Sequence, residues 1–118
     1  MEYLKGEAVL LRILIGEADK HEGNPLYQWI VEYLKKERIS GATVIRGILG
    51  YGPRSIVHTT HILRLSQDLP IVIEVVDTQE NLDRVLPVIK EAVGDGLITA
   101  ERVQVIKYGV GSVRKKDL

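Results

Sequence analysis

Residues 41–55 read Gly-Ala-Thr-Val-Ile-Arg-Gly-Ile-Leu-Gly-Tyr-Gly-Pro-Arg-Ser. The first half of this stretch is rich in β-branched residues, which favour a half-buried strand. The second half holds three glycines ahead of Pro53, and glycine lets the main chain bend and lets a ligand approach the backbone closely. These glycines are Gly47, Gly50 and Gly52. The stretch therefore predicts a strand that runs directly into a bending loop.

The glycine spacing, G-x-x-G-x-G, matches neither of two common phosphate-binding motifs. The dinucleotide fingerprint is G-x-G-x-x-G and leads straight into a helix, and a P-loop ends in Lys-Ser or Lys-Thr. On these residues alone, the simpler interpretation is a strand that ends in a bulge and a turn, with Pro53 stopping the ladder. A ligand-binding loop stays open as the alternative.

Length and composition limit the classes of protein that the chain can belong to. Its 118 residues can form one compact domain with a hydrophobic core. Sixteen basic residues balance sixteen acidic ones, so the positive field that would attract nucleic acid is missing, and we expect no nucleic-acid partner. The chain has no cysteine, which excludes disulfides, thiolate metal sites and cysteine nucleophiles. The early apolar run is far shorter than a bilayer span, so we expect a soluble, cytoplasmic protein.

Four segments have the branched, alternating composition of strands. They are residues 7–15, residues within 41–48, residues 69–77 and residues 100–108. We predict one domain over residues 1–109 and a loose basic tail over residues 110–118, where Arg114, Lys115 and Lys116 follow one another.

Two helices are predicted between these strands. Asn24 as a cap and Pro25 at the first helical position begin the first helix, which ends near residues 40–41. Asp77 or Thr78 caps the second, with Glu80 placed for a capping box on Asp77, and Pro87 predicts a kink or an irregular turn inside it. The resulting order, βαββαβ, is the ferredoxin-like split βαβ: an α+β fold with one antiparallel sheet and two helices on one face.

Two helices leave the other face of such a sheet uncovered. Alternation along the first three strands gives each an apolar face with a single charge, and we expect these to be the open faces. They consist of Ala8, Leu10, Arg12 and Leu14, then Val44, Arg46 and Ile48, then Val72, Glu74 and Val76. Such a surface predicts oligomerisation, with Arg12 or Arg46 paired to Glu74 across the sheet or between subunits. The alternative is that these faces are the covered ones and the charges lie at strand ends.

Several motifs occur in an order that resembles a known family. Ile45-Arg46-Gly47 runs into Gly50-Tyr51-Gly52, Asp68-Leu69-Pro70 opens the third strand, and Gly94-Asp95-Gly96 precedes the fourth. Over residues 5–109 this order resembles the PII-like signalling proteins, and most closely the branch called domain of unknown function 190. The resemblance implies a homotrimer whose sheets face a central axis, with small-molecule sites in the clefts between subunits.

The resemblance also implies a site for a small anionic effector, an adenine nucleotide. The matching positions are Gly50, Tyr51, Gly52 and Arg54, then Gly94, Asp95 and Gly96, then Lys107. Glycine loops present bare N–H groups to phosphate oxygens, and the two cations add positive charge. The chain has Leu97 and Gly109 where nucleotide-binding members have lysine and arginine, which implies an effector less charged than ATP, or none. The loop over residues 50–60 would contact a target, a membrane transporter or an enzyme.

The sequence offers three alternatives to effector binding. The carboxylates are scattered and no Ser-His-Asp spacing stands out, so we predict that the protein is not an enzyme. His58 and His61, with His21, could hold a divalent metal, as in a related trimeric fold associated with metal tolerance, but residues three apart in a strand point to opposite faces. A structural trimer that binds a protein partner is the main alternative.

Overall fold

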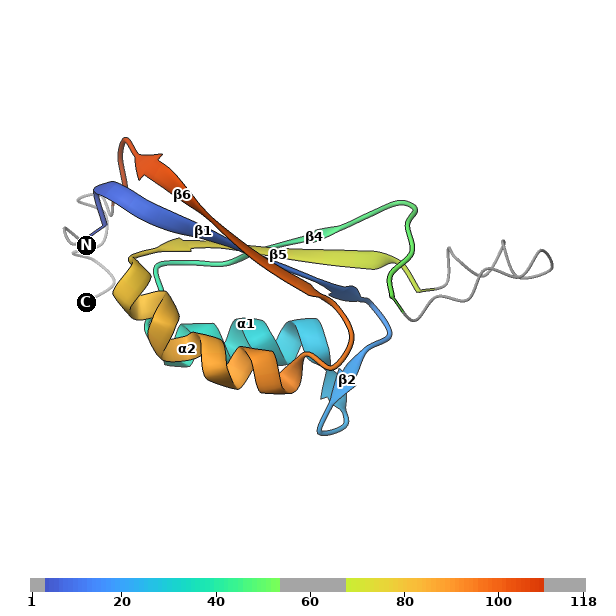
Figure 1. The fold of residues 1–118 in the computed structure, drawn as a ribbon. Helices are drawn as coiled ribbons and strands as arrows, with labels where there is room; N and C mark the ends of the chain where they lie inside the picture. The colour runs from blue at the N-terminus through green and yellow to red at the C-terminus, as the bar shows by residue number, and fades with distance from the viewer. Residues whose placement is uncertain (1–3, 54–67, 110–118) are drawn as a thin grey trace, which may run out of the picture.

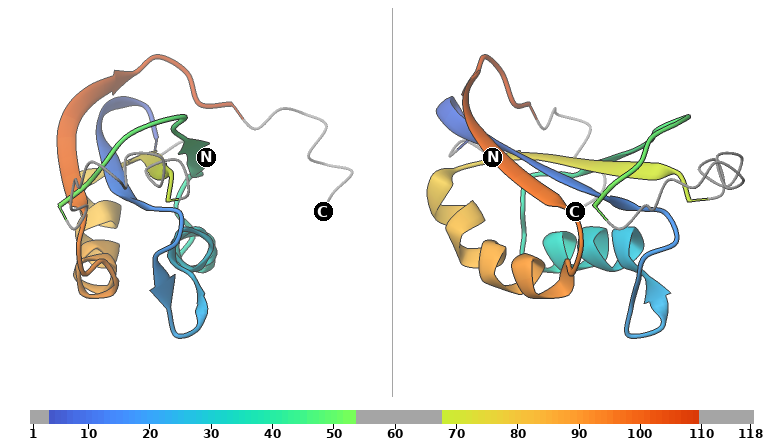
Figure 2. Two further views of the ribbon diagram at one scale, coloured as in Figure 1. Left: turned by 90° about the vertical axis from the view of Figure 1, so that its right-hand side faces the viewer. Right: turned by 45° about the vertical axis from the view of Figure 1, so that its right-hand side comes forward.

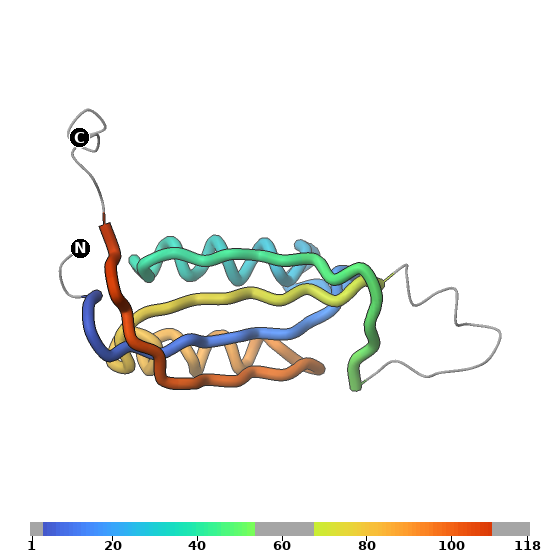
Figure 3. Tube along the Cα trace, turned by 90° about the horizontal axis from the view of Figure 1, so that it is seen from above, coloured from blue at the N-terminus to red at the C-terminus, as the bar shows by residue number. Residues whose placement is uncertain are grey.

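A computed structural model describes residues 4–53 and 68–109 of the chain. Four antiparallel strands form one sheet in the order β4-β5-β1-β6, and two helices cover one of its faces (Figure 1). The strands are β1 (Gly6–Gly16), β4 (Thr43–Arg46), β5 (Pro70–Asp77) and β6 (Leu97–Val105). The helices are α1 (Leu26–Lys36) and α2 (Gln79–Ala92). The predicted α+β, ferredoxin-like arrangement is confirmed, and Figure 3 looks onto the open face with all four strands side by side.

The hydrophobic core lies between the sheet and the two helices. Burial alternates strictly along β5 and along most of β1, as expected when helices cover one face only. The helices contribute residues at three- and four-residue spacing, which lie on one side of each helix. The buried core side chains are Val9, Leu11, Ile13 and Ile15 from β1, Ile71, Ile73 and Val75 from β5, Leu26, Ile30 and Leu34 from α1, Leu82, Val85 and Ile89 from α2, and Ile39 from the segment after α1.

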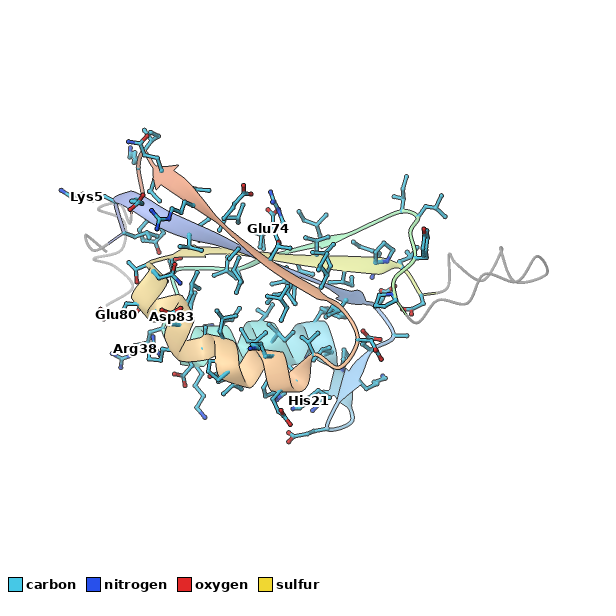
Figure 4. All side chains as sticks on the ribbon, in the orientation of Figure 1. Lys5, His21, Arg38, Glu74, Glu80 and Asp83 are labelled. Atoms are coloured by element: carbon cyan, nitrogen blue, oxygen red, sulfur yellow. The ribbon has the colours of Figure 1, made fainter. Side chains whose placement is uncertain are left out.

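A charged cluster lies in the middle of the open face. Arg12 is directly opposite Glu74 in the ladder, and its Nε donates to Glu74 Oε2 at 2.9 Å. Its Nη1 donates to Glu101 Oε1, also at 2.9 Å. These bonds, that to Glu74 first, raise the pKa of Arg12. The predicted pairing of Arg12 with Glu74 is confirmed, and Figure 4 shows Glu74 on the side of the sheet away from the helices.

The predicted face of β4 is wrong. Ile45 pairs with Val72 and Val44 with Ile73, so Thr43 and Ile45 share the open face. Arg46 lies on the other side, where its Nη2 is 2.5 Å from Glu17 Oε2, and Ile48 lies beyond the strand. Because strand side chains alternate, a one-residue error in register exchanges the two faces.

Several predicted boundaries also differ. Helix α1 has Pro25, not Asn24, at its N-cap position without a side-chain cap, and it ends at Lys36, four residues before residue 40. Strand β6 begins three residues before the predicted 100 and ends at Val105 rather than 108. A short hairpin of β2 (Lys20–His21) and β3 (Asn24–Pro25) was not predicted, and Figure 2 shows it projecting on the helix side of the sheet.

The second helix begins at one of its two predicted caps but lacks the predicted capping box. Thr78 is the N-cap, and its side chain accepts from the N–H of Asn81 at 3.1 Å. The side chain of Asn81, rather than Glu80, returns to Asp77, at 2.9 Å. Helix α2 is continuous from Gln79 to Ala92 with Pro87 inside it, so it has no irregular turn there, and a kink at Pro87 stays a prediction. The predicted tail over residues 110–118 lies outside the described residues.

In the part of the chain that the structure describes, neither helix has the length and apolar composition needed to cross a bilayer.

Candidate functional site

A pocket of about 470 Å³ lies at one end of the sheet. Its walls come from four segments: residues 14–16 with Asp19, residues 50–53, Asp68 with Pro70, and residues 95–97. Small-molecule sites in proteins commonly enclose about 300–1,000 Å³, so the volume suits a metabolite. We call this cavity the effector pocket, after the effector site that the sequence predicts at its lining residues.

The sheet topology brings these segments together. In the antiparallel ladders Gly16 lies opposite Pro70 and Leu14 opposite Leu97, so the end of β1 meets the beginnings of β5 and β6. The N–H of Gly47 donates to the carbonyl of Pro70 at 2.7 Å, which brings the chain leaving β4 to the same end. This is the right-hand end of the sheet in Figure 1.

Five of the eight residues predicted for the site line this one pocket. They are Gly50, Tyr51, Gly52, Asp95 and Gly96. Gly94 directly precedes the last wall segment without lining the pocket, and Arg54 lies outside the described residues.

Lys107 lies near the opposite end of β6. It lines a second concavity, of about 690 Å³, that also includes Leu10 and Tyr108. Leu97 and Val105 are eight residues apart in one strand, which at about 3.3 Å per residue separates them by about 26 Å. Lys107 therefore cannot reach the effector pocket of its own chain.

Two glycines of the predicted loops have structural roles that the sequence did not reveal. A Cβ atom on Gly96 would lie 2.6 Å from the carbonyl oxygen of Leu14, so only glycine lets the start of β6 pack against β1. A Cβ on Gly50 would lie 2.9 Å from Cγ of Pro70. By contrast, a Cβ on Gly52 would meet no heavy atom within 4 Å, so this backbone borders open space.

Two aspartates of the pocket were not among the predicted site residues. Asp68 accepts a hydrogen bond from the N–H of Ala18 at 2.9 Å, and Asp19 accepts one from the N–H of Gly16 at 3.0 Å. Both side chains brace the turn after β1. Side-chain bonds of aspartate to nearby backbone are typical of turns, and Asp19, three residues after Gly16, was the sequence feature that could have indicated one. The bond to Asp68 joins residues 50 apart, so no local pattern indicates it. None of the described lining residues is a lysine or an arginine.

The described residues show no cluster of three or more histidine, aspartate or glutamate side chains that could hold a metal. His21 packs against Trp29, with ring centroids 4.2 Å apart and planes tilted by 56°. His58 and His61 lie outside residues 4–53 and 68–109.

Solved structures with the same arrangement are PII-like proteins. CPII of Thiomonas intermedia K12, bound to ADP, AMP and acetate, aligns with a TM-score of 0.63 at 15% identity, over 86% of this chain and 91% of that one. A putative PII-like signaling protein of Thermus thermophilus aligns with a TM-score of 0.59 at 20% identity, over 86% and 91%. The fold is therefore that of the PII-like class.

Sequence relatives identify the family within this class. A UPF0166 protein of Methanocaldococcus jannaschii is 46% identical over 102 residues, which are 86% of this chain and 94% of that protein. A UPF0166 protein of Aquifex aeolicus is 40% identical over 97 residues, 82% of this chain and 91% of that protein. The sequence model of domain of unknown function 190, described as an uncharacterized ACR, matches residues 8–105. The chain belongs to this family, as its motifs indicated.

Proposed function

We propose that this protein is a PII-like signalling protein whose effector pocket binds an adenine nucleotide at the boundary between subunits of a homotrimer. The observation that carries the proposal is the convergence of two glycine-bearing segments, far apart in the sequence, on one pocket. Residues 50–52 and 95–96 were expected to act together, and they line the same cavity. The ADP and AMP bound to CPII, which has the same fold, favour an adenine nucleotide as the ligand.

The lining of the effector pocket suits the parts of a nucleotide. Tyr51 is 74% exposed at one wall, so its ring is available to a base. Stacking of a base on an aromatic side chain contributes about 1–3 kcal/mol. A Cβ at Gly52 would meet no heavy atom within 4 Å, so a ligand can approach the main chain closely there. Leu14 and Leu97 supply apolar contact area to the same cavity.

The open face of the sheet suits burial against other subunits. Leu97 is 54% exposed there and Ile45 47%, beside the cluster of Arg12 with its two glutamates. An apolar surface of this kind is favourable in water only when it is covered. In a trimer, Lys107 would reach the effector pocket of a neighbouring subunit and supply the positive charge that the described walls of one chain lack.

Isothermal titration calorimetry with ADP, AMP, ATP and cyclic AMP tests the proposal. Tyr51→Ala should weaken nucleotide binding by about 1–3 kcal/mol. The matched control is Leu49→Ala, which removes a 69% exposed side chain from the same segment but outside the pocket lining. Arg54→Ala should weaken binding by about 1.5–3 kcal/mol, the contribution of one charge-assisted hydrogen bond.

Absence of binding by the wild type at millimolar concentration would refute effector sensing and favour a structural trimer that binds a protein partner. Binding that Tyr51→Ala leaves unchanged would place the nucleotide elsewhere. The target of signalling is expected to be a membrane transporter or an enzyme that responds to the loop over residues 50–60.

A further inference from the structure

The segment that leads into β5 is held from two sides. On one side, Ala18 donates its N–H to the side chain of Asp68 at 2.9 Å, and Glu17 donates its N–H to the carbonyl of Leu69 at 2.8 Å. On the other side, Gly47 donates its N–H to the carbonyl of Pro70 at 2.7 Å. Residues 68–70 thus join the end of β1 to the exit of β4, and both of these regions border the effector pocket.

The turn after β4 is wrapped around the ring of Pro70. A Cβ on Gly47 would lie 2.6 Å from Cγ of Pro70, and a Cβ on Gly50 would lie 2.9 Å from the same atom. Real Cβ atoms essentially never approach a heavy atom within 3.0 Å, so the ring occupies the space that side chains at both positions would need. Proline fixes its own backbone angle φ, so this ring is a rigid support for the turn.

We infer that Pro70 is a positioning residue of the effector pocket. Its ring determines where the turn of residues 47–50 leaves the sheet, and therefore where Tyr51 and Gly52 lie in the wall of the cavity. This inference rests on the proposed function, because it concerns how the same pocket is held ready for its ligand. Sites bind tightly when supporting residues hold the contacting groups in place before the ligand arrives.

The contact between positions 50 and 70 predicts how substitutions at the two positions affect each other. Gly50→Ala collides with Cγ of Pro70, whereas Pro70→Ala removes that atom and leaves the turn unsupported. In the double variant the new Cβ at position 50 would lie 3.6 Å from the Cβ at position 70, which is an ordinary van der Waals contact. The two substitutions should therefore compensate each other.

The test is a double-variant cycle measured by calorimetry, with ADP and AMP as probes. We expect Pro70→Ala and Gly50→Ala each to weaken binding about tenfold, and the double variant to bind within about threefold of the wild type. Melting temperatures are measured alongside. Pro87→Ala, which removes a proline from α2 outside the pocket lining, is the control and should leave the affinities unchanged.

If the wild type binds, three results would overturn this inference alone. The first is single variants with unchanged affinity, and the second is losses of affinity that add in the double variant. The third is losses of affinity that parallel a fall in melting temperature. A wild type that binds neither ADP nor AMP would instead overturn the proposed function and this inference together. The two failures are therefore distinguishable.

Discussion

Substitution of Asp77 by alanine should destabilise the fold more than any exposed charge change. The side chain of Asp77 is fully buried. Its carboxylate accepts hydrogen bonds from the N–H of Ser40 at 2.8 Å, the N–H of Thr78 at 2.7 Å and the side chain of Asn81 at 2.9 Å. It thereby ties the loop after α1 to the first turn of α2. A hydrogen bond to a charged group contributes about 1.5–3 kcal/mol, and several bonds on one carboxylate do not add fully. We therefore expect Asp77→Ala to lower the free energy of unfolding by about 3–5 kcal/mol.

Urea unfolding at fixed protomer concentration measures this loss, because the stability of an oligomer depends on concentration. Asp77→Asn should cost about 1.5–3 kcal/mol, since it keeps one acceptor oxygen but turns an amide donor toward another donor. Asp83→Ala is the control. Asp83, labelled on α2 in Figure 4, accepts an exposed hydrogen bond from the side chain of Gln79. Asp83→Ala should therefore lower the free energy of unfolding by about 0.5 kcal/mol or less. A loss of under about 1 kcal/mol for Asp77→Ala would refute the assigned role of this carboxylate.

Three further outcomes follow from the packing and the electrostatics. Gly96→Ala should lower the melting temperature, because its Cβ would lie 2.6 Å from the carbonyl oxygen of Leu14; an unchanged transition in differential scanning calorimetry would contradict this. Burial raises the pKa of the Tyr33 phenol above its usual 10.0, so the unfolded chain ionises first and the free energy of unfolding should fall as the pH rises past 10.0. Urea titrations at pH 9 and 11 should show a smaller fall in the free energy of unfolding for Tyr33→Phe than for the wild type. An equal fall in the two proteins would contradict the role of burial. Leu10→Asp should dissociate the proposed trimer, because it would bury an unpaired charge, whereas Val88→Asp, on α2, should leave the mass from light scattering unchanged; a monomeric wild type would contradict the assembly itself.

The fold was predictable because its strongest patterns are local and redundant. β1 and β5 are long runs of branched residues, and the apolar spacing of α1 and α2 is regular. Many residues of each element therefore indicate the same secondary structure. β4 is different, because it has four residues and Val44 and Ile45 are both apolar, so either face could have been buried. Its register is decided by pairing with β5, a tertiary contact that no local pattern contains.

The site was predictable in part for a similar reason. Glycine-rich stretches indicate loops, and the ferredoxin-like order places residues 50–52 and 95–96 at one end of the sheet. The sequence does not show why a glycine is needed: Gly96 and Gly50 allow close packing on Leu14 and Pro70, whereas a Cβ on Gly52 would meet no heavy atom within 4 Å. The predicted strand over residues 100–108 already separated Lys107 from residues 94–96 by the length of a strand, and the observed β6 keeps this separation.

An NMR titration of the ¹⁵N-labelled protein with ADP tests the central claim most directly, because it reports both binding and its location. The account predicts shifts concentrated at the amides of residues 50–52 and 95–97, which line the effector pocket on both sides. Amides of exposed residues of α2 outside the pocket lining, such as Glu80 and Asp83, should stay unchanged and serve as internal controls. A spectrum without shifts at millimolar ADP, or shifts gathered away from these two segments, would contradict the account.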